Sequence, residues 1–164
     1  MIVFQEARNP KQENNRLLSI RKALKKKQFR VLIIEPTSKC NLKCSFCDMH
    51  NDSLDTNSKK INMELSTFNL IIQSLKKLDY KLKSIQLHGY GEPLLHKQII
   101  MMVQNLKPFT ENLRIITNGT ALNEKIHDKL VNAGIDEIHI SVDVTDRFEY
   151  KRIKAKDLYG KVIE

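Results

Sequence analysis

The chain has 164 residues, of which 41% are hydrophobic and 29% are charged, and it carries a formal net charge of +9. This balance is ordinary for a soluble globular protein, and no apolar run is long enough to cross a membrane or to act as a secretory signal. We therefore expect a cytoplasmic protein whose cysteines stay reduced. The chain has three cysteines, and this odd number also argues against a framework of disulfides.

The positive charge is concentrated at the start of the chain. Residues 1–29 contain eight lysines or arginines against two acidic residues. Residues 12–27 have the periodicity of an amphipathic helix, with Leu17, Ile20 and Leu24 on one stripe. We interpret this segment as a basic helical extension with a solvated charged face. The alternative is an arm that binds nucleic acid or an acidic substrate.

From residue 30 onward, short β-branched runs alternate with longer helical patterns. The predicted strands are Arg30 to Glu35, Lys83 to His88, Leu113 to Thr117 and Asp136 to Val142. The predicted helices are residues 64–78, Leu95 to Lys107, Leu122 to Gly134, Phe148 to Ile153 and Leu158 to Ile163. Four strand–helix units in succession imply an α/β fold with a parallel sheet, which is either an open doubly wound sheet or part of a barrel.

The distribution of polar residues along the strands favours a partial (β/α) barrel. Ile85 and Leu87 alternate with polar residues in the second strand, and Ile138 and Ile140 do so in the fourth. One face of the sheet can thus receive helices, while the other becomes polar toward the carboxyl ends of the strands. The inward-facing candidates for substrate contact are Glu35, Gln86, His88 and His139, whereas His50, His96 and His127 are expected at the surface.

All three cysteines lie in one loop directly after the first predicted strand. They are Cys40, Cys44 and Cys47, with the spacing Cys-x3-Cys-x2-Cys. Soft thiolate ligands select zinc, Cu(I) or iron–sulfur clusters. A cubane cluster ordinarily takes four cysteines, so three would leave one iron open to a molecule that is not protein. The alternative is a Cys3His zinc site completed by His50, in a module stabilised by that metal.

This loop resembles the signature of the radical S-adenosylmethionine (SAM) superfamily, in which an aromatic residue, here Phe46, precedes the last cysteine. The resemblance implies a partial (β/α) barrel whose 4Fe–4S cluster binds SAM through its open iron. By the family's mechanism, the reduced cluster cleaves SAM to methionine and a 5′-deoxyadenosyl radical, which abstracts hydrogen from a substrate. An external electron donor and a small-molecule or peptide substrate are implied as partners.

The turn after the second predicted strand resembles another motif of this family. Gly91, Glu92 and Pro93 match its Gly-Gly-Glu-Pro turn, which binds the SAM amino group, while Tyr90 stands in place of the first glycine. A carboxylate beside an ammonium group is favourable in a partly dry site. An ordinary strand-to-helix turn is the structural alternative.

The ends of the later strands carry further matches to the family. Asn118 belongs to a third-strand motif near the cofactor or the substrate, and Ser141 and Asp143 resemble a Ser-x-Asp that bonds the ribose hydroxyls of SAM. Phe46 would pack near the adenine. The structural alternatives are a turn at Asn118, a strand-end cap at Ser141 and Asp143, and a core position for Phe46.

The number of strand–helix units is small for a barrel. Eight units need about 250 residues, and the chain ends within an amphipathic pattern. We therefore interpret residues 30–164 as a truncated radical SAM-like barrel that follows the extension at residues 1–29. From the sequence Cys-Asn-Leu-Lys-Cys we expect an auxiliary-cluster domain of the SPASM type downstream. A chain that keeps the motifs but lacks activity is the further alternative.

Overall fold

The computed structural model describes residues 30–48 and 61–163. The predicted basic helix at residues 12–27, His50 and most of the predicted loop after Asp48 lie outside these ranges. The elements described below belong to one unit, Val31–Glu164. None of the helices in the described ranges has the length and apolar character needed to span a lipid bilayer.

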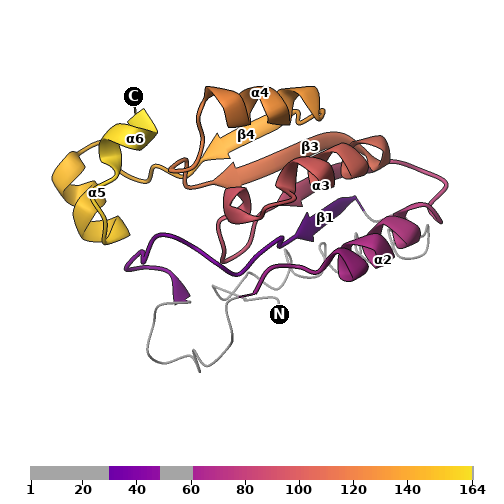
Figure 1. The fold of residues 1–164 in the computed structure, drawn as a ribbon, viewed down its shortest axis with the longest axis horizontal. Helices are drawn as coiled ribbons and strands as arrows, with labels where there is room; N and C mark the ends of the chain where they lie inside the picture. The colour runs from indigo at the N-terminus through magenta and orange to yellow at the C-terminus, as the bar shows by residue number, and fades with distance from the viewer. Residues whose placement is uncertain (1–29, 49–60, 164) are drawn as a thin grey trace, which may run out of the picture. The chain divides into compact units, whose positions relative to one another are not determined.

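Four parallel strands form one sheet in the order β1-β2-β3-β4 (Figure 1). Leu87 of β2 lies opposite Ile34 of β1 on one side and opposite Ile115 of β3 on the other. Because each new strand joins the edge that the previous strand left open, order in sequence and order in space coincide. In a barrel, strands are added in sequence order, whereas in a doubly wound sheet the order of strands reverses at one point. The strands are β1 (Val31–Ile34), β2 (Leu82–Leu87), β3 (Thr110–Thr117) and β4 (Glu137–Ile140).

Helices follow each strand, as the sequence predicts. Three of them, α2, α3 and α4, connect successive strands, and α5 and α6 come after β4 (Figure 1). The helices are α2 (Leu65–Leu75), α3 (Ile99–Leu106), α4 (Glu124–Asn132), α5 (Arg147–Lys154) and α6 (Tyr159–Ile163), with short 3-10 turns η2 (Pro93–Leu95) and η3 (Lys107–Phe109) on either side of α3. After α4 the chain turns at Gly134, whose φ of +91° confirms the predicted C-terminal glycine.

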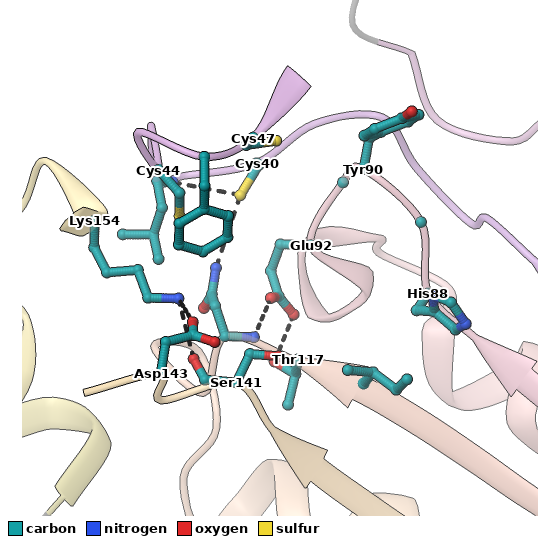
Figure 2. Close-up of a pocket in the computed structure, with 16 residues that line it drawn as sticks. Cys40, Cys44, Cys47, His88, Tyr90, Glu92, Thr117, Ser141, Asp143 and Lys154 are labelled. Atoms are coloured by element: carbon teal, nitrogen blue, oxygen red, sulfur yellow. Dashed lines mark hydrogen bonds and ion pairs between the residues drawn. The ribbon is translucent and has the colours of Figure 1, made fainter. Parts of the chain in front are cut away.

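The hydrophobic core lies between the helices and one face of the sheet. From Ser84 to the end of β2 and from Asn112 to the end of β3, every second residue is buried, and Ser84 and Gln86 fall on the opposite face. That second face leads, at the carboxyl ends of the strands, to the cavity shown in Figure 2. The core includes Ile34, Ile85, Leu87, Leu113 and Ile115 from the strands and Phe68, Ile72, Leu75, Ile99, Met102, Val103, Leu106 and Leu130 from the helices.

The helix predicted from Leu95 to Lys107 is interrupted, and the prediction of a surface position for His96 was wrong. His96 is 3% exposed, and its ring Nε2 lies 3.2 Å from the carbonyl oxygen of Met63. Its Nδ1 accepts a hydrogen bond from the Gln98 amide, which holds the backbone out of the helix between η2 and α3. The ring is buried because it joins the segment before α2 to the start of α3.

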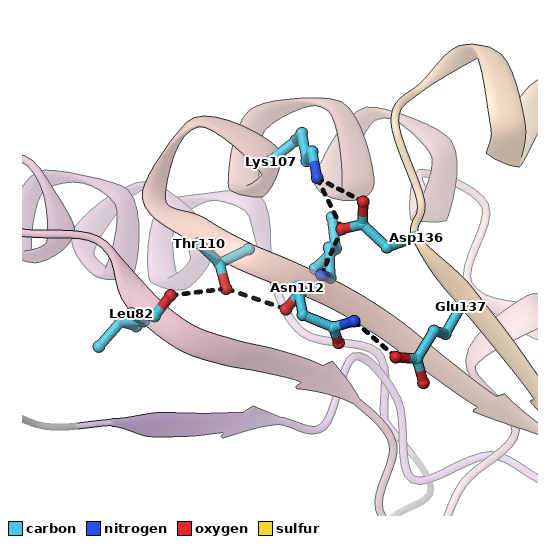
Figure 3. A network of polar contacts seen from close by, with 7 residues as sticks. Leu82, Lys107, Thr110, Asn112, Asp136 and Glu137 are labelled. Carbon is cyan, nitrogen blue, oxygen red and sulfur yellow. Dashed lines mark hydrogen bonds and ion pairs between the residues drawn. The ribbon is translucent and has the colours of Figure 1, made fainter.

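Polar contacts align β3 with its neighbours (Figure 3). The strand begins at Thr110, three residues earlier than predicted, because the buried Thr110 hydroxyl donates to the carbonyl of Leu82 on β2. The side-chain amide of Asn112 donates to Glu137 on β4 at 2.6 Å. Residues 110–112 pair with β2, which extends the strand beyond its predicted start.

An ion pair fixes the start of β4. The Lys107 ammonium lies 2.6 Å from the Asp136 carboxylate, and a carboxylate oxygen of Asp136 also accepts a hydrogen bond from the Leu113 amide at 2.6 Å. The Asp136 amide in turn donates to the Leu113 carbonyl. One side chain therefore joins η3, β3 and β4.

Asp136→Asn is expected to lower the free energy of unfolding by about 1 kcal/mol at neutral pH. Burial opposes ionisation of the Asp136 carboxyl, but the hydrogen bonds from Lys107 and the Leu113 amide outweigh burial and lower its pKa. The stabilisation is therefore present above the unfolded-state pKa of about 3.9 and is lost as the pH falls through the folded-state value.

Urea denaturation between about pH 3 and pH 7 measures this difference. The gap between wild type and Asp136→Asn should shrink toward the acid end, and a gap that is independent of pH would contradict the assignment. Lys107→Met is the matched variant. It should cause most of the same loss, and adding Asp136→Asn to it should cost little more.

Candidate cofactor site

A cavity of about 210 Å³ lies at the carboxyl ends of the strands (Figure 2). Its walls come from the cysteine loop after β1, the turn after β2, the end of β3, the segment after β4 and the last residue of α5. Nearly all of the residues singled out in the sequence line it, namely Cys40, Cys44, Phe46, Cys47, Gly91, Glu92, Asn118, Ser141 and Asp143. Pro93 does not line the cavity, because it is buried at the start of η2.

The cysteine loop is anchored by a buried residue and presents its three free thiols half-exposed. Leu42 is buried within the loop, and its amide approaches the Cys40 sulfur at 3.5 Å. The Cys47 amide donates to the Cys44 carbonyl at 3.0 Å, which closes a tight turn between these two cysteines. The loop therefore holds all three sulfurs at the wall of one cavity.

The donor set fits an iron–sulfur cluster. In residues 30–48 and 61–163, no three His, Cys, Asp or Glu side chains are grouped as a single metal ion would need. A cubane cluster offers a separate iron to each thiolate, so it needs three sulfurs around one cavity. Burial raises the pKa of the Cys44 thiol, opposed by Lys154 and assisted by Cys40 and Cys47.

The turn after β2 packs directly against the start of the cysteine loop. A Cβ atom on Gly91 would come within 1.8 Å of the Thr37 carbonyl oxygen, and the Glu92 amide donates to the Lys39 carbonyl at 2.8 Å. Only glycine fits this contact without displacing backbone. Tyr90 is exposed and directed away from the cavity centre (Figure 2), so the departure from the family's first glycine does not disturb the contact.

Glu35, a candidate for substrate contact, bonds to the turn after β2. Its carboxylate accepts hydrogen bonds from the amides of Tyr90 at 2.6 Å and Gly91 at 3.1 Å. A Cβ atom on Gly89 would also collide with this side chain. The carboxylate thus fixes the turn after β2 to the end of β1, which the sequence could not indicate because the turn is far away in the chain.

Glu92 is 2% exposed and is held by donors from two segments. One oxygen accepts from the Thr117 hydroxyl at 2.6 Å and the Leu94 amide at 3.0 Å, and the other accepts from the Asn118 amide at 2.7 Å. Burial raises the pKa of Glu92, and these hydrogen bonds oppose the rise. A carboxylate has about four acceptor positions, so the second oxygen has room for another donor.

Asn118 connects the end of β3 to the cysteine loop. Its side-chain amide donates to the Asn41 side chain at 3.0 Å and approaches the Cys40 sulfur at 3.8 Å. The Thr120 hydroxyl donates to the Asn118 side-chain oxygen at 2.6 Å. The orientation of this amide is therefore fixed by both neighbours, with its N–H groups toward the loop.

Lys154 is a site residue that sequence reasoning missed. Its side chain is buried and pairs with Asp143, and its ammonium donates to the Ser141 carbonyl at 3.2 Å. The same ammonium lies 5.3 Å from the centre of the Phe46 ring, within cation–π range (Figure 2). Asp143 has a φ of +67°, a conformation that Asp tolerates better than most residues. No local signal distinguishes Lys154 from the exposed basic residues beside it.

The other candidates for substrate contact, His88, Gln86 and His139, differ in whether they line the cavity. His88 lines the cavity, and burial lowers its pKa, against the effect of Glu35. Gln86 is half-buried on the same face of β2. His139 is exposed and bonds to Glu137 at 2.7 Å. His127 is exposed, as expected.

Gly91→Ala is expected to destabilise the fold by about 1 to 3 kcal/mol, because the added methyl group meets backbone that has to move. Chemical denaturation of the purified chain measures the loss. Gly160→Ala in α6 is the control, since alanine is favoured over glycine within a helix. Equal stability of Gly91→Ala and wild type would show that the turn and the cysteine loop do not pack as described.

Comparisons with known proteins agree with this geometry. The model of the radical SAM superfamily matches residues 34–164. A probable GTP 3′,8-cyclase of Pyrococcus abyssi is 32% identical over 133 residues, which cover 81% of this chain and 41% of the relative. The protein of the same name from Saccharolobus solfataricus is 33% identical over 134 residues, with 81% and 41% covered. The chain thus spans about two-fifths of the length of these relatives.

Solved structures of BtrN are similar in fold to this chain. The complex of BtrN with AdoMet and 2-DOIA has a TM-score of 0.61 and 26% identity, over 82% of this chain and 55% of that one. BtrN in an open conformation has a TM-score of 0.58 and 27% identity, over 68% and 49%. The partial barrel predicted from the strand pattern is confirmed, as is the family resemblance: this chain belongs to the radical SAM superfamily of enzymes.

Proposed function

We propose that this chain holds a 4Fe–4S cluster on Cys40, Cys44 and Cys47 and binds SAM in the adjoining cavity, to start hydrogen abstraction from a substrate. The observation that carries the proposal is the single cavity that the three cysteines share with the ends of β2, β3 and β4. When bound and reduced, the cluster supplies the electron that cleaves SAM to methionine and a 5′-deoxyadenosyl radical. The chain's own residues bind, orient and shield these groups.

The turn after β2 is suited to the amino group of SAM. The buried Glu92 carboxylate has one acceptor position left on the oxygen that bonds Asn118. A positively charged amino group would find a fixed negative charge there, in a site from which most water is excluded. The three existing donors hold the carboxylate in place before the ligand arrives.

The segment after β4 is suited to the ribose. Ser141 lines the cavity, where its hydroxyl could bond to a sugar hydroxyl. Asp143 is held by Lys154, which leaves its second oxygen to accept from a sugar hydroxyl. Phe46, which is 61% exposed and lies over the Lys154 ammonium, offers an apolar face to the adenine.

The substrate is proposed to be a small molecule that enters from the polar face of the sheet, past His88. GTP appears in the names of the relatives, which favours a small molecule over a peptide. An external reductant has to supply the electron, and we place the protein in the cytoplasm. The cavity walls are proposed to bind the cluster and SAM. They do not select among substrates.

Anaerobic reconstitution with iron and sulfide tests the cluster. The wild type should take up about four irons and four sulfides per chain and show the absorbance of a 4Fe–4S cluster, while a triple Cys40/Cys44/Cys47→Ala variant should take up none. His127→Ala, an exposed histidine away from the cavity, should behave like the wild type. Equal iron uptake by the triple variant would overturn the assignment, and one zinc per chain with no cluster would favour the zinc alternative.

Ser141→Ala tests the ribose contact. Loss of one neutral hydrogen bond of about 1 kcal/mol should weaken SAM binding to the reconstituted protein about fivefold. Calorimetry measures the affinity, and release of 5′-deoxyadenosine after reduction measures the outcome. Ser74→Ala on the exposed side of α2 is the matched control and should leave both unchanged. Unaltered SAM affinity in Ser141→Ala would remove Ser141 from the site.

A further inference from the structure

A buried hydroxyl without a partner lies on α5. Tyr150 is 0% exposed, and its hydroxyl makes no hydrogen bond in the part of the chain that the structure describes. Its ring packs edge-on against Tyr159, with ring centres 5.7 Å apart. Leaving a buried hydroxyl unpaired costs about 1 to 3 kcal/mol, so we expect this hydroxyl to gain a partner in another state of the protein.

The end of α5 that carries Tyr150 is docked on the cysteine loop. The Ser45 amide donates to the Ile153 carbonyl at 2.8 Å, and the Lys43 amide donates to the Lys154 carbonyl at 3.4 Å. These two contacts lie on either side of Cys44. Tyr150 precedes Lys154 by one helical turn, so the two side chains share a face of α5, and both are buried. This end of α5 therefore lies against the part of the loop that carries Cys44.

Electrostatics support the same placement. Burial raises the pKa of the Tyr150 hydroxyl, and negative charge on Cys44 and on Asp143 raises it further. A phenolic hydroxyl carries its proton at physiological pH and can act as a donor. A neutral thiol is a poor acceptor, whereas a thiolate that ligates a metal accepts hydrogen bonds well.

We propose that the Tyr150 hydroxyl donates a hydrogen bond to the sulfur of Cys44 once that sulfur is a ligand of the cluster, and thereby raises the reduction potential of the cluster. This inference rests on the proposed function. Hydrogen bonds to the sulfurs are among the features that set the potential of an iron–sulfur cluster. A donor stabilises the reduced state more, because reduction adds negative charge. Tyr150 is thus a positioning and tuning residue that touches a ligand rather than the substrate.

Tyr150→Phe removes only the hydroxyl, and a redox titration of the reconstituted protein followed by electron paramagnetic resonance measures its effect. At the ambient potential that half-reduces the wild type, the ratio of reduced to oxidised cluster should fall about tenfold in the variant, which corresponds to a midpoint about 59 mV more negative. Tyr159→Phe is the matched control. Its hydroxyl donates to the Thr145 carbonyl, so its loss should leave the midpoint unchanged.

A second measurement uses the protein without iron. Because the Tyr150 hydroxyl has no partner in that state, Tyr150→Phe should unfold at the same denaturant concentration as the wild type or at a higher one. A clear loss of stability would show that the hydroxyl already bonds to the chain, which would overturn the inference.

The outcomes separate this inference from the proposed function. If the wild type and Tyr150→Phe both fail to take up a cluster, the proposed function is overturned and this inference with it. If both take up the cluster and have equal midpoints, only the role of Tyr150 is overturned. A negative shift in Tyr150→Phe that Tyr159→Phe does not reproduce supports the inference.

Discussion

One buried carboxylate joins the segments that meet at the carboxyl ends of the strands. Glu92 receives donors from its own turn and from the end of β3, while its amide bonds to the segment before Cys40. An ionised group leaves water at a high cost unless several donors replace the water, so these three segments have to meet in one arrangement. The position of the cysteine loop relative to the strands follows from that requirement.

The parallel topology explains why residues from distant parts of the chain share the cavity. Each crossover returns the chain so that the next strand runs in the same direction, and the carboxyl ends of all four strands meet at one edge. Cys40, Glu92, Asn118 and Ser141 each come just after a strand. The strands supply the positions, and the short segments that follow them supply the chemistry.

Much of this site could be predicted because it depends on residue type at a strand end. The cysteine spacing, the Gly91 turn and the alternation in β2 are local patterns. Lys154 and Tyr150 could not be predicted, since α5 is rich in exposed charged residues and only its docking on the cysteine loop buries these two. The inward alternation makes Glu35 a candidate for substrate contact, and its bonds to the amides of the turn after β2 could not be predicted because that turn is distant in the sequence.

The half-exposed thiols of the cysteine loop have a consequence for handling in air. Dioxygen that reaches the cavity can attack these thiols, since thiols are oxidised according to their accessibility and thiolate character. Burying the loop more deeply would protect the sulfurs, and under the proposed function it would also slow the arrival of electrons. Under that proposal the same exposure links sensitivity to oxygen with ease of reduction, which favours purification without oxygen.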